Sequence, residues 1–105
     1  MPGPPRPGFA ATNDHGEITV VLSGDLDISS RRWLAQRLAE TMEQQPRRLV
    51  VDMAEVGFAD CASMRLIVAT RRSLPDGSRP VISRLRPVVR RVLHVTGLDM
   101  LCDLT

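Results

Sequence analysis

The chain of 105 residues contains no lysine and no tyrosine, and aromatic residues make up only 3% of it. All 14 of its cationic residues are arginine, which excludes Schiff-base catalysis by lysine and a phosphate-binding loop of the GxxxxGK type. Two cysteines are too few for a disulfide scaffold in a chain of this length. The composition that is left, 43% hydrophobic and 25% charged, is typical of one globular domain with a core of its own.

Long apolar runs and targeting segments are missing as well. No run approaches the ~20 residues of a membrane span, and the first residues have no apolar stretch of the kind found in a secretory signal. The arginines occur as pairs scattered between acidic residues, whereas a nucleic-acid surface usually shows a clustered basic stripe. With a net charge of +2, the sequence predicts a cytoplasmic protein that binds neither nucleic acid nor membrane.

The chain divides into a short leader and one domain. Residues 1–8 hold four of the eight prolines, which predicts a disordered Pro/Gly-rich leader before a domain over 9–105. The alternation of β-branched runs and amphipathic stretches predicts an α/β fold, with helices packed against a mixed sheet of four to five strands. Strands are expected at 9–13, 18–22, 49–53, 81–82 and 100–104, and helices at 29–45, 60–74 and 87–97. The apolar run 49–53 predicts a strand buried on both faces.

Carboxylates follow the ends of the expected strands. Asp25 and Asp27 fall in a polar loop predicted at 23–27, and Asp60 precedes the second helix. In open α/β sheets, ligands and partners gather at this edge. Asp52 also ends a strand, but a phosphoacceptor of the two-component receiver type needs a lysine, so that class is excluded.

Trp33 lies on the polar side of the first expected helix. At helical spacing it falls beside Arg37 and Glu40, away from the apolar stripe that contains Leu34 and Leu38. Two roles are open at this point: the ring covers an edge of the helix, or it anchors a partner, since tryptophan is over-represented at binding hot spots.

The second expected helix begins with Asp60-Cys61-Ala62-Ser63-Met64. Asp60 can cap this helix, and the free amides of its first turn accommodate negative charge, including a phosphate on a hydroxyl group. The histidines and cysteines have no metal-ligand spacing, so we expect no metal and no cofactor.

Four segments occur in a characteristic order and at characteristic intervals. They are Leu22-Ser23-Gly24-Asp25-Leu26-Asp27, the run from Arg48 to Met53, Val56-Gly57-Phe58-Ala59-Asp60, and the run from Pro87 to Leu98. Together they resemble a STAS domain of the bacterial anti-sigma-factor antagonist type, over about residues 9 to 104. The resemblance implies a STAS-like fold in one domain.

The resemblance also implies a non-catalytic switch. Such domains bind an anti-sigma factor, often a serine kinase of the histidine-kinase-like ATPase family, and so release a sigma factor for transcription. In the family, the second helix usually opens Asp-Ser-Ser/Thr-Gly-Leu, and phosphorylation of the first serine ends the complex by adding charge to a packed interface. Here Asp60 matches the aspartate, but Cys61 occupies the phosphoserine position, Ala62 the next hydroxyl, Ser63 the glycine and Met64 the leucine.

The expected function is therefore an antagonist whose kinase control is lost or rerouted. Ser63 lies roughly 200° round the helix from Cys61, so a kinase aligned on the family site should miss it. The residues expected to bind the partner are Asp25, Asp27, Trp33, Asp60, Cys61, Ala62, Ser63 and Met64, in a monomer or a weak dimer.

Two other functions stay open at this point. One is a thiol-based redox switch at Cys61, because a helix N-terminus favours the thiolate, although the neighbouring Asp60 opposes that charge. The other is a non-phosphorylated scaffold in a larger sensory complex, as some STAS proteins are.

Overall fold

The computed structural model describes residues 7–105, so residues 1–6, most of the expected leader, lie outside the described residues. The strands are β1 (Gly8–Asp14), β2 (Glu17–Leu26), β3 (Arg48–Ala59), β4 (Val81–Ser83) and β5 (Asp103–Leu104). The α-helices are α1 (Arg31–Met42), α2 (Cys61–Ala69) and α3 (Pro87–Thr96), and the 3₁₀ helices are η1 (Thr70–Ser73) and η2 (Leu98–Leu101). The α/β fold predicted from the sequence is confirmed.

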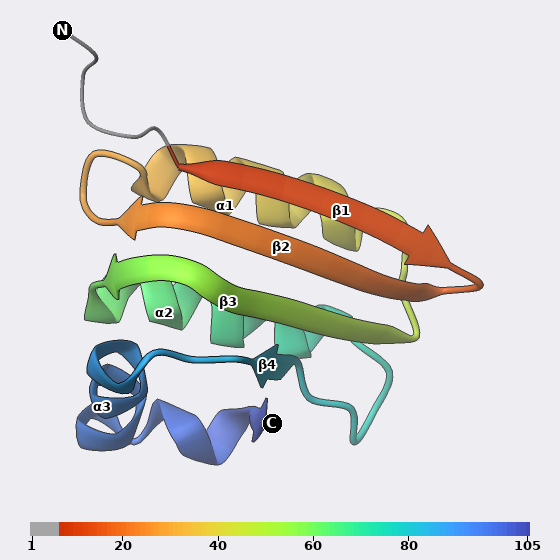
Figure 1. Ribbon diagram of the computed structural model, residues 1–105. Coiled ribbons are helices and arrows are strands. Elements are labelled where there is room, and N and C mark those ends of the chain that lie inside the picture. The colour runs from red at the N-terminus through yellow and green to blue at the C-terminus, as the bar shows by residue number, and fades with distance from the viewer. Residues whose placement is uncertain (1–6) are drawn as a thin grey trace, which may run out of the picture.

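The five strands form one mixed sheet in the order β1-β2-β3-β4-β5 (Figure 1). β1 and β2 form an antiparallel hairpin, and the three remaining pairs of neighbours are parallel. The helices serve as crossovers between parallel strands, as this connection requires. As a result, β2, β3 and β4 all end on the same side of the molecule, where α3 also begins (Figure 1).

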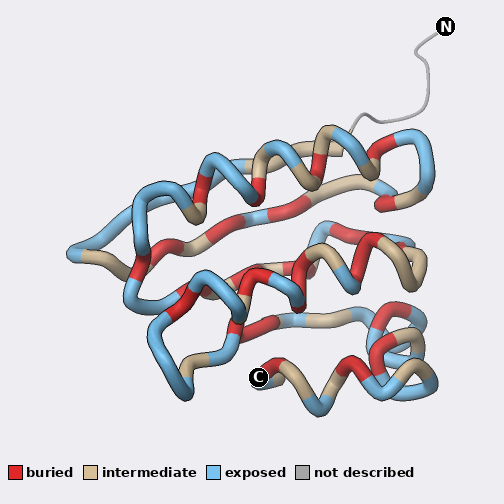
Figure 2. Tube along the Cα trace, turned by 180° about the vertical axis from the view of Figure 1, so that it is seen from behind, coloured by how far each residue is buried: buried red, intermediate tan, exposed pale blue. Residues whose placement is uncertain are grey.

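One face of the sheet carries the core. α1 and α2 lie together on that face (Figure 1), and buried residues recur along β2, β3 and both helices (Figure 2). Neighbouring strands place Val20 opposite Val51, and Val51 opposite Ile82, and none of these three side chains is exposed. The prediction that 49–53 is buried on both faces is wrong, because none of the helices within residues 7–105 covers the other face, where Val50 and Asp52 are only half-buried.

Two strands are longer than the sequence predicted. Residues 23–26, expected in a polar loop, continue β2, and residues 54–59 continue β3. The two extensions pair with each other through register shifts between Val21 and Ser23 and between Gly24 and Asp25. Parallel pairing supplies the backbone hydrogen bonds that the polar composition of 23–26 does not by itself predict.

Two helices end earlier than predicted. α1 ends at Met42 instead of Gln45, because Gln45 has a positive φ of 52° that a right-handed helix cannot contain. α2 ends at Ala69 and continues as the tighter turn η1. By contrast, α3 begins with Pro87 and stops at Gly97, whose φ is 75°, as the sequence predicted.

Candidate functional site

The expected site residues gather where the parallel strands end. We name this region the carboxyl edge; it comprises the end of β2 with the loop before α1, the junction of β3 and α2, and the first turn of α3. Its side chains relevant here are Asp25, Asp27, Ile28, Arg31, Phe58, Asp60, Cys61 and Val88. The carboxylates that the sequence singled out are therefore neighbours in space, as expected for this edge of an α/β sheet.

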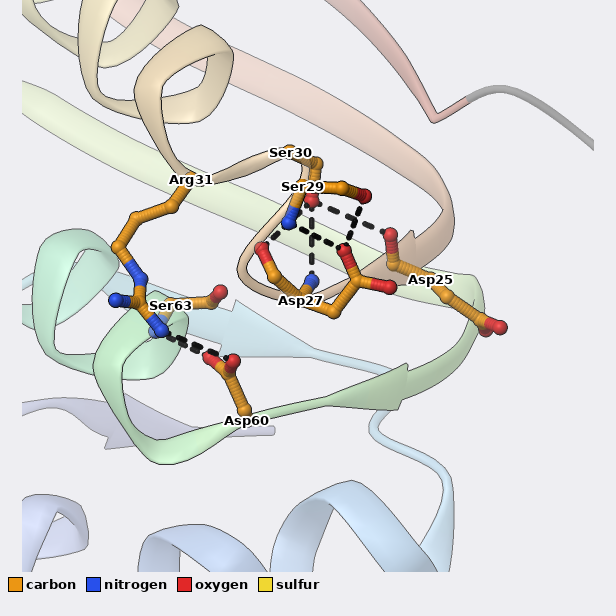
Figure 3. Close-up of polar contacts among 7 residues, drawn as sticks. All are labelled: Asp25, Asp27, Ser29, Ser30, Arg31, Asp60 and Ser63. Carbon is orange, nitrogen blue, oxygen red and sulfur yellow. Dashed lines mark hydrogen bonds and ion pairs between the residues drawn. The ribbon is translucent and has the colours of Figure 1, made fainter.

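Asp60 joins three elements of the carboxyl edge (Figure 3). Its Oδ1 accepts a hydrogen bond from the Ser63 backbone N–H at 2.8 Å, which caps α2 as predicted. Its Oδ2 accepts from an Arg31 guanidinium nitrogen at 3.2 Å, and its backbone N–H donates to the Leu26 carbonyl at 2.9 Å. The start of α2 is thus fixed both to α1 and to the end of β2.

The charge of Asp60 is stabilised by these contacts. Burial works to raise the pKa of Asp60, but the hydrogen bonds from Ser63 and the Arg31 guanidinium outweigh it, and the pKa lies below its usual value. Asp60 is therefore ionised at neutral pH, and Arg31 balances its charge at the N-terminus of α2.

The loop between β2 and α1 is held by its own side chains (Figure 3). Asp27 Oδ1 accepts from the Ser29 backbone N–H at 2.9 Å and from the Ser29 hydroxyl at 2.6 Å. Ser30 Oγ accepts from the Asp27 N–H at 3.0 Å and donates to the Asp27 carbonyl at 3.2 Å. The Ser29 hydroxyl lowers the pKa of Asp27, so this loop presents a fixed negative charge.

The first turn of α2 divides into accessible and buried residues. Cys61 and Ala62 are half-buried at the surface, whereas Ser63 and Met64 are completely buried. Among the described residues, Ser63 Oγ has no hydrogen-bond partner. Of the four residues of this turn expected to bind a partner, only Cys61 and Ala62 can therefore contact one directly; Ser63 and Met64 anchor the helix in the core.

Trp33 packs against the first strand. Its ring meets Phe9 edge to face, with 6.2 Å between centroids and 90° between planes. The half-buried indole thus covers an edge of α1, which is one of the two roles left open by the sequence. It also lines a shallow hollow of about 290 Å³ with Ser29 and Ser30, so its exposed part borders the carboxyl edge.

Three apolar side chains at the carboxyl edge were missed by the sequence reasoning. Ile28 is 77% exposed, Val88 51% and Phe58 44%. They come from the loop before α1, the first turn of α3 and the penultimate position of β3. We name these three residues the apolar trio. A prediction that β3 continues to Ala59 would have placed Phe58 at this edge, but the sequence predicted a strand that ends at Met53.

Asp52 belongs to a different contact. It lies on the open face of the sheet and forms an ion pair with Arg84, whose Nε is 3.2 Å from Asp52 Oδ1. The hydrogen bonds from Arg84 lower the pKa of Asp52. Arg86 Nε donates to the Ala54 carbonyl at 3.0 Å, so both arginines tie the segment before α3 to β3. This contact supports the position of Val88.

Two kinds of feature were not found within residues 7–105. No cluster of three His, Cys, Asp or Glu side chains there could hold a metal ion. None of the helices in the same range is long and apolar enough to cross a membrane. Both cysteines are free thiols.

Comparison with known proteins gives consistent results. A family model described as "Mlab, STAS domain" matches residues 9–103. The anti-sigma-F factor antagonist RsfB of Mycobacterium tuberculosis is 25% identical over 87 residues, which cover 82% of this chain and 71% of RsfB.

Solved structures give the same fold. An anti-sigma factor antagonist from Mycobacterium paratuberculosis matches with a TM-score of 0.86 and 25% identity, covering 99% of this chain and 89% of its own. The phosphorylated form of the Bacillus cell fate determinant SpoIIAA matches with a TM-score of 0.68 and 17% identity, covering 93% of this chain and 91% of its own.

Proposed function

This chain belongs to the STAS domain family, and from that premise and the geometry of its carboxyl edge we propose that it acts as an anti-sigma factor antagonist. RsfB and the M. paratuberculosis protein both carry that description. We assign the activity to a single domain, whose first strand β1 begins at Gly8. The protein acts in the cytoplasm, where a bound anti-sigma factor can no longer hold its sigma factor, and it catalyses no reaction.

The observation that carries the proposal is the apolar trio. Ile28, Phe58 and Val88 are large apolar side chains exposed on three segments at one edge, and a protein–protein interface is built from exposed apolar side chains of this kind. The carboxylates of Asp25 and Asp27 lie on the segment that contains Ile28 and supply a charged rim. The partner that fits is an anti-sigma factor with an apolar docking surface and basic residues around it.

Phosphorylation does not control this interaction in our proposal. SpoIIAA has been solved in a phosphorylated form. We infer from the resemblance of the segment 60–64 to the family's motif that Cys61 takes the place of the phosphorylated serine in this chain. A serine kinase transfers phosphate to a hydroxyl group, and the only hydroxyl in the first turn of α2 belongs to Ser63, which is completely buried. An anti-sigma kinase would therefore dock on this chain without switching it off.

The test is to mix the purified chain with its anti-sigma factor and ATP and to measure binding and the intact mass. We expect a stable complex and no gain in mass. Failure to bind any anti-sigma factor of the same host would overturn the proposed function. One phosphate mapped to Ser63 would overturn the loss of phosphorylation control while leaving the antagonist function intact.

The variant Cys61→Ser sharpens the test, because it restores the hydroxyl at an accessible position. We expect it to gain one phosphate and to lose affinity once phosphorylated, since about two negative charges enter the interface. Cys61→Ala is the matched control, which should bind like the original chain and gain no phosphate.

The two other functions are less well supported. A thiol switch would depend on Cys61, which is a free, half-buried thiol. A scaffold in a larger sensory complex would require self-association of this domain. Size-exclusion chromatography separates the scaffold from the monomer or weak dimer that we propose.

A further inference from the structure

A second charged region lies at the opposite end of the sheet, where the parallel strands begin. Two hollows of about 420 and 310 Å³ are found there, and both are lined by Gly77, Ser78 and Arg79. Arg71 and Arg72 line the larger hollow, and Arg47 and Arg48 the smaller one. We name this region, with its five arginines, the amino edge.

These arginines come from three separate segments of the chain. Arg47 and Arg48 precede and begin β3, Arg71 and Arg72 belong to η1, and Arg79 precedes β4. In the linear sequence they are scattered between acidic residues, which argued against a basic surface. The parallel topology places the starts of β3 and β4 side by side, because Val50 and Val81 are partners in the sheet.

The positive charge of the amino edge is only partly neutralised. Of the five arginines, Arg48 contacts a carboxylate, that of Glu17 at 4.0 Å, and the other four form no ion pair among the described residues. Asp76 and Asp103 also line the hollows, and neither forms an ion pair among residues 7–105. Five guanidinium groups are therefore accompanied by three carboxylates, those of Glu17, Asp76 and Asp103.

Two of the guanidinium groups are held in place by backbone carbonyls. Arg79 Nη1 donates to the Met100 carbonyl at 2.8 Å, and Arg47 donates from Nε and Nη2 to the His15 carbonyl at 3.1 and 2.6 Å. These bonds fix the side chains without cancelling their charge. Arg71 Nε is buried and has no hydrogen-bond partner among the described residues, and a buried donor without a partner is costly.

We propose that the amino edge binds a small molecule carrying two or more phosphate groups. One phosphate occupies the larger hollow against Arg71 and Arg72, a second lies toward Arg47 in the smaller one, and Arg79 contacts both. The guanidinium group presents a planar fork of N–H donors that matches phosphate oxygens in pairs. The larger hollow has the size of a small-ligand site, about 300–1,000 Å³.

The shape favours a compact anion over a macromolecule. Carboxylates at the rim repel an extended polyanion, and the residues that line the two hollows include no aromatic ring on which a nucleobase could stack. Leu74 and Leu101 form the apolar part of the larger hollow. A short polyphosphate chain can reach both arginine groups and avoid the carboxylates.

The experiment is a calorimetric titration of the full chain with inorganic tripolyphosphate at low ionic strength. We expect saturable binding at one site, weakened about tenfold or more in Arg71→Gln/Arg79→Gln, because charge-assisted hydrogen bonds are lost. Arg32→Gln/Arg90→Gln removes two arginines outside both hollows and should keep the original affinity. If both double variants weaken binding equally, the attraction is one of net charge and the site is disproved.

Two further measurements keep the test decisive. Arg72 is exposed, so Arg72→Gln should fold normally and still weaken binding if the double variant is unstable. A titration with hexaglutamate, a short polycarboxylate, separates phosphate from carboxylate ligands. Tighter binding of hexaglutamate than of tripolyphosphate would overturn the proposal in favour of an acidic protein segment. None of these outcomes depends on an anti-sigma factor, so the proposed function is tested separately.

Discussion

The two ends of the parallel strands differ in how their charges are held. At the carboxyl edge, Asp60 and Asp27 are bound by backbone amides, hydroxyls and one arginine, and apolar side chains stand exposed beside them. At the amino edge, four of five arginines have no acidic partner among the described residues, and the hollows between them are polar. This difference is why we propose a protein partner for one end of the sheet and an anion for the other.

The largest expected effect is a loss of affinity for the anti-sigma factor when the docking surface at the carboxyl edge is disrupted. Ile28→Asp places a charge in the apolar trio, and we expect the affinity for the anti-sigma factor to fall about 30-fold or more, as at a hot spot worth about 2 kcal/mol. Surface plasmon resonance measures the change. Val95→Asp is the control, since Val95 is 72% exposed but lies at the far end of α3, and it should leave affinity unchanged. Equal losses in both variants would contradict the location of the surface.

A smaller effect is expected on the free energy of unfolding, to which the aspartates of the two edges should contribute differently. Asp60→Ala removes the cap of α2 and the contact with Arg31, and we expect it to lower the free energy of unfolding by about 1–2 kcal/mol. Asp76→Ala, in the exposed turn of the amino edge, should change it by less than about 0.5 kcal/mol. Urea unfolding followed by circular dichroism gives both values. A loss at Asp76 as large as that at Asp60 would remove the distinction between held and free carboxylates.

Acid should weaken the contacts of the held carboxylates. Hydrogen bonds from Arg84 lower the pKa of Asp52 below its ordinary value of 3.8. The associated stability is therefore fully present above pH 3.8 and is lost as the pH falls through the lowered pKa. We expect the coupling between Asp52→Asn and Arg84→Gln in a double-mutant cycle to be favourable at pH 7 and to shrink below pH 3.8. A coupling that does not change with pH would contradict this assignment.

The smallest expected effect concerns the two thiols. Cys61 is half-buried at the carboxyl edge, whereas Cys102 is 4% exposed and burial raises the pKa of its thiol. A thiol-exchange reagent at neutral pH should label Cys61 alone in the folded chain and Cys102 only after unfolding. Cys61→Ser should change the free energy of unfolding by less than about 0.5 kcal/mol. Simultaneous labelling of both thiols would show that the C-terminal segment opens more readily than its burial indicates.

The sequence predicted the elements better than their ends. Helix α3 was correct because Pro87 and Gly97 act locally, through the fixed φ of proline and the positive φ of glycine. The extensions of β2 and β3 were missed because residues 23–26 and 54–59 form strands by pairing with each other. Such pairing is a contact between distant segments, and composition within a short window does not contain it.

The candidate site was predicted only in part, again because some of its contacts join segments that are distant in the sequence. Asp60 was identified as a cap from its position before an apolar run, and the hydrogen bond to Ser63 confirms that role. Its contact with Arg31 joins two helices and could not be read from spacing. The exposure of the apolar trio was missed too, because Phe58 resembles a core residue in the sequence and its 44% exposure depends on what the fold packs around it.

By itself, the sequence determined the family, the α/β class, the caps of two helices and the position of Cys61 at the start of α2, because these depend on residue type and local spacing. The tertiary structure alone decided which hydroxyls and apolar side chains are accessible: it buries Ser63, exposes Ile28 and Val88 at one edge, and gathers the scattered arginines at the other. The physical reason is that burial and charge clustering are properties of distant segments brought together by parallel strand pairing. Cys61 illustrates both: its place at the start of α2 follows from the sequence, whereas only the fold leaves its thiol half-buried and the Ser63 hydroxyl completely buried.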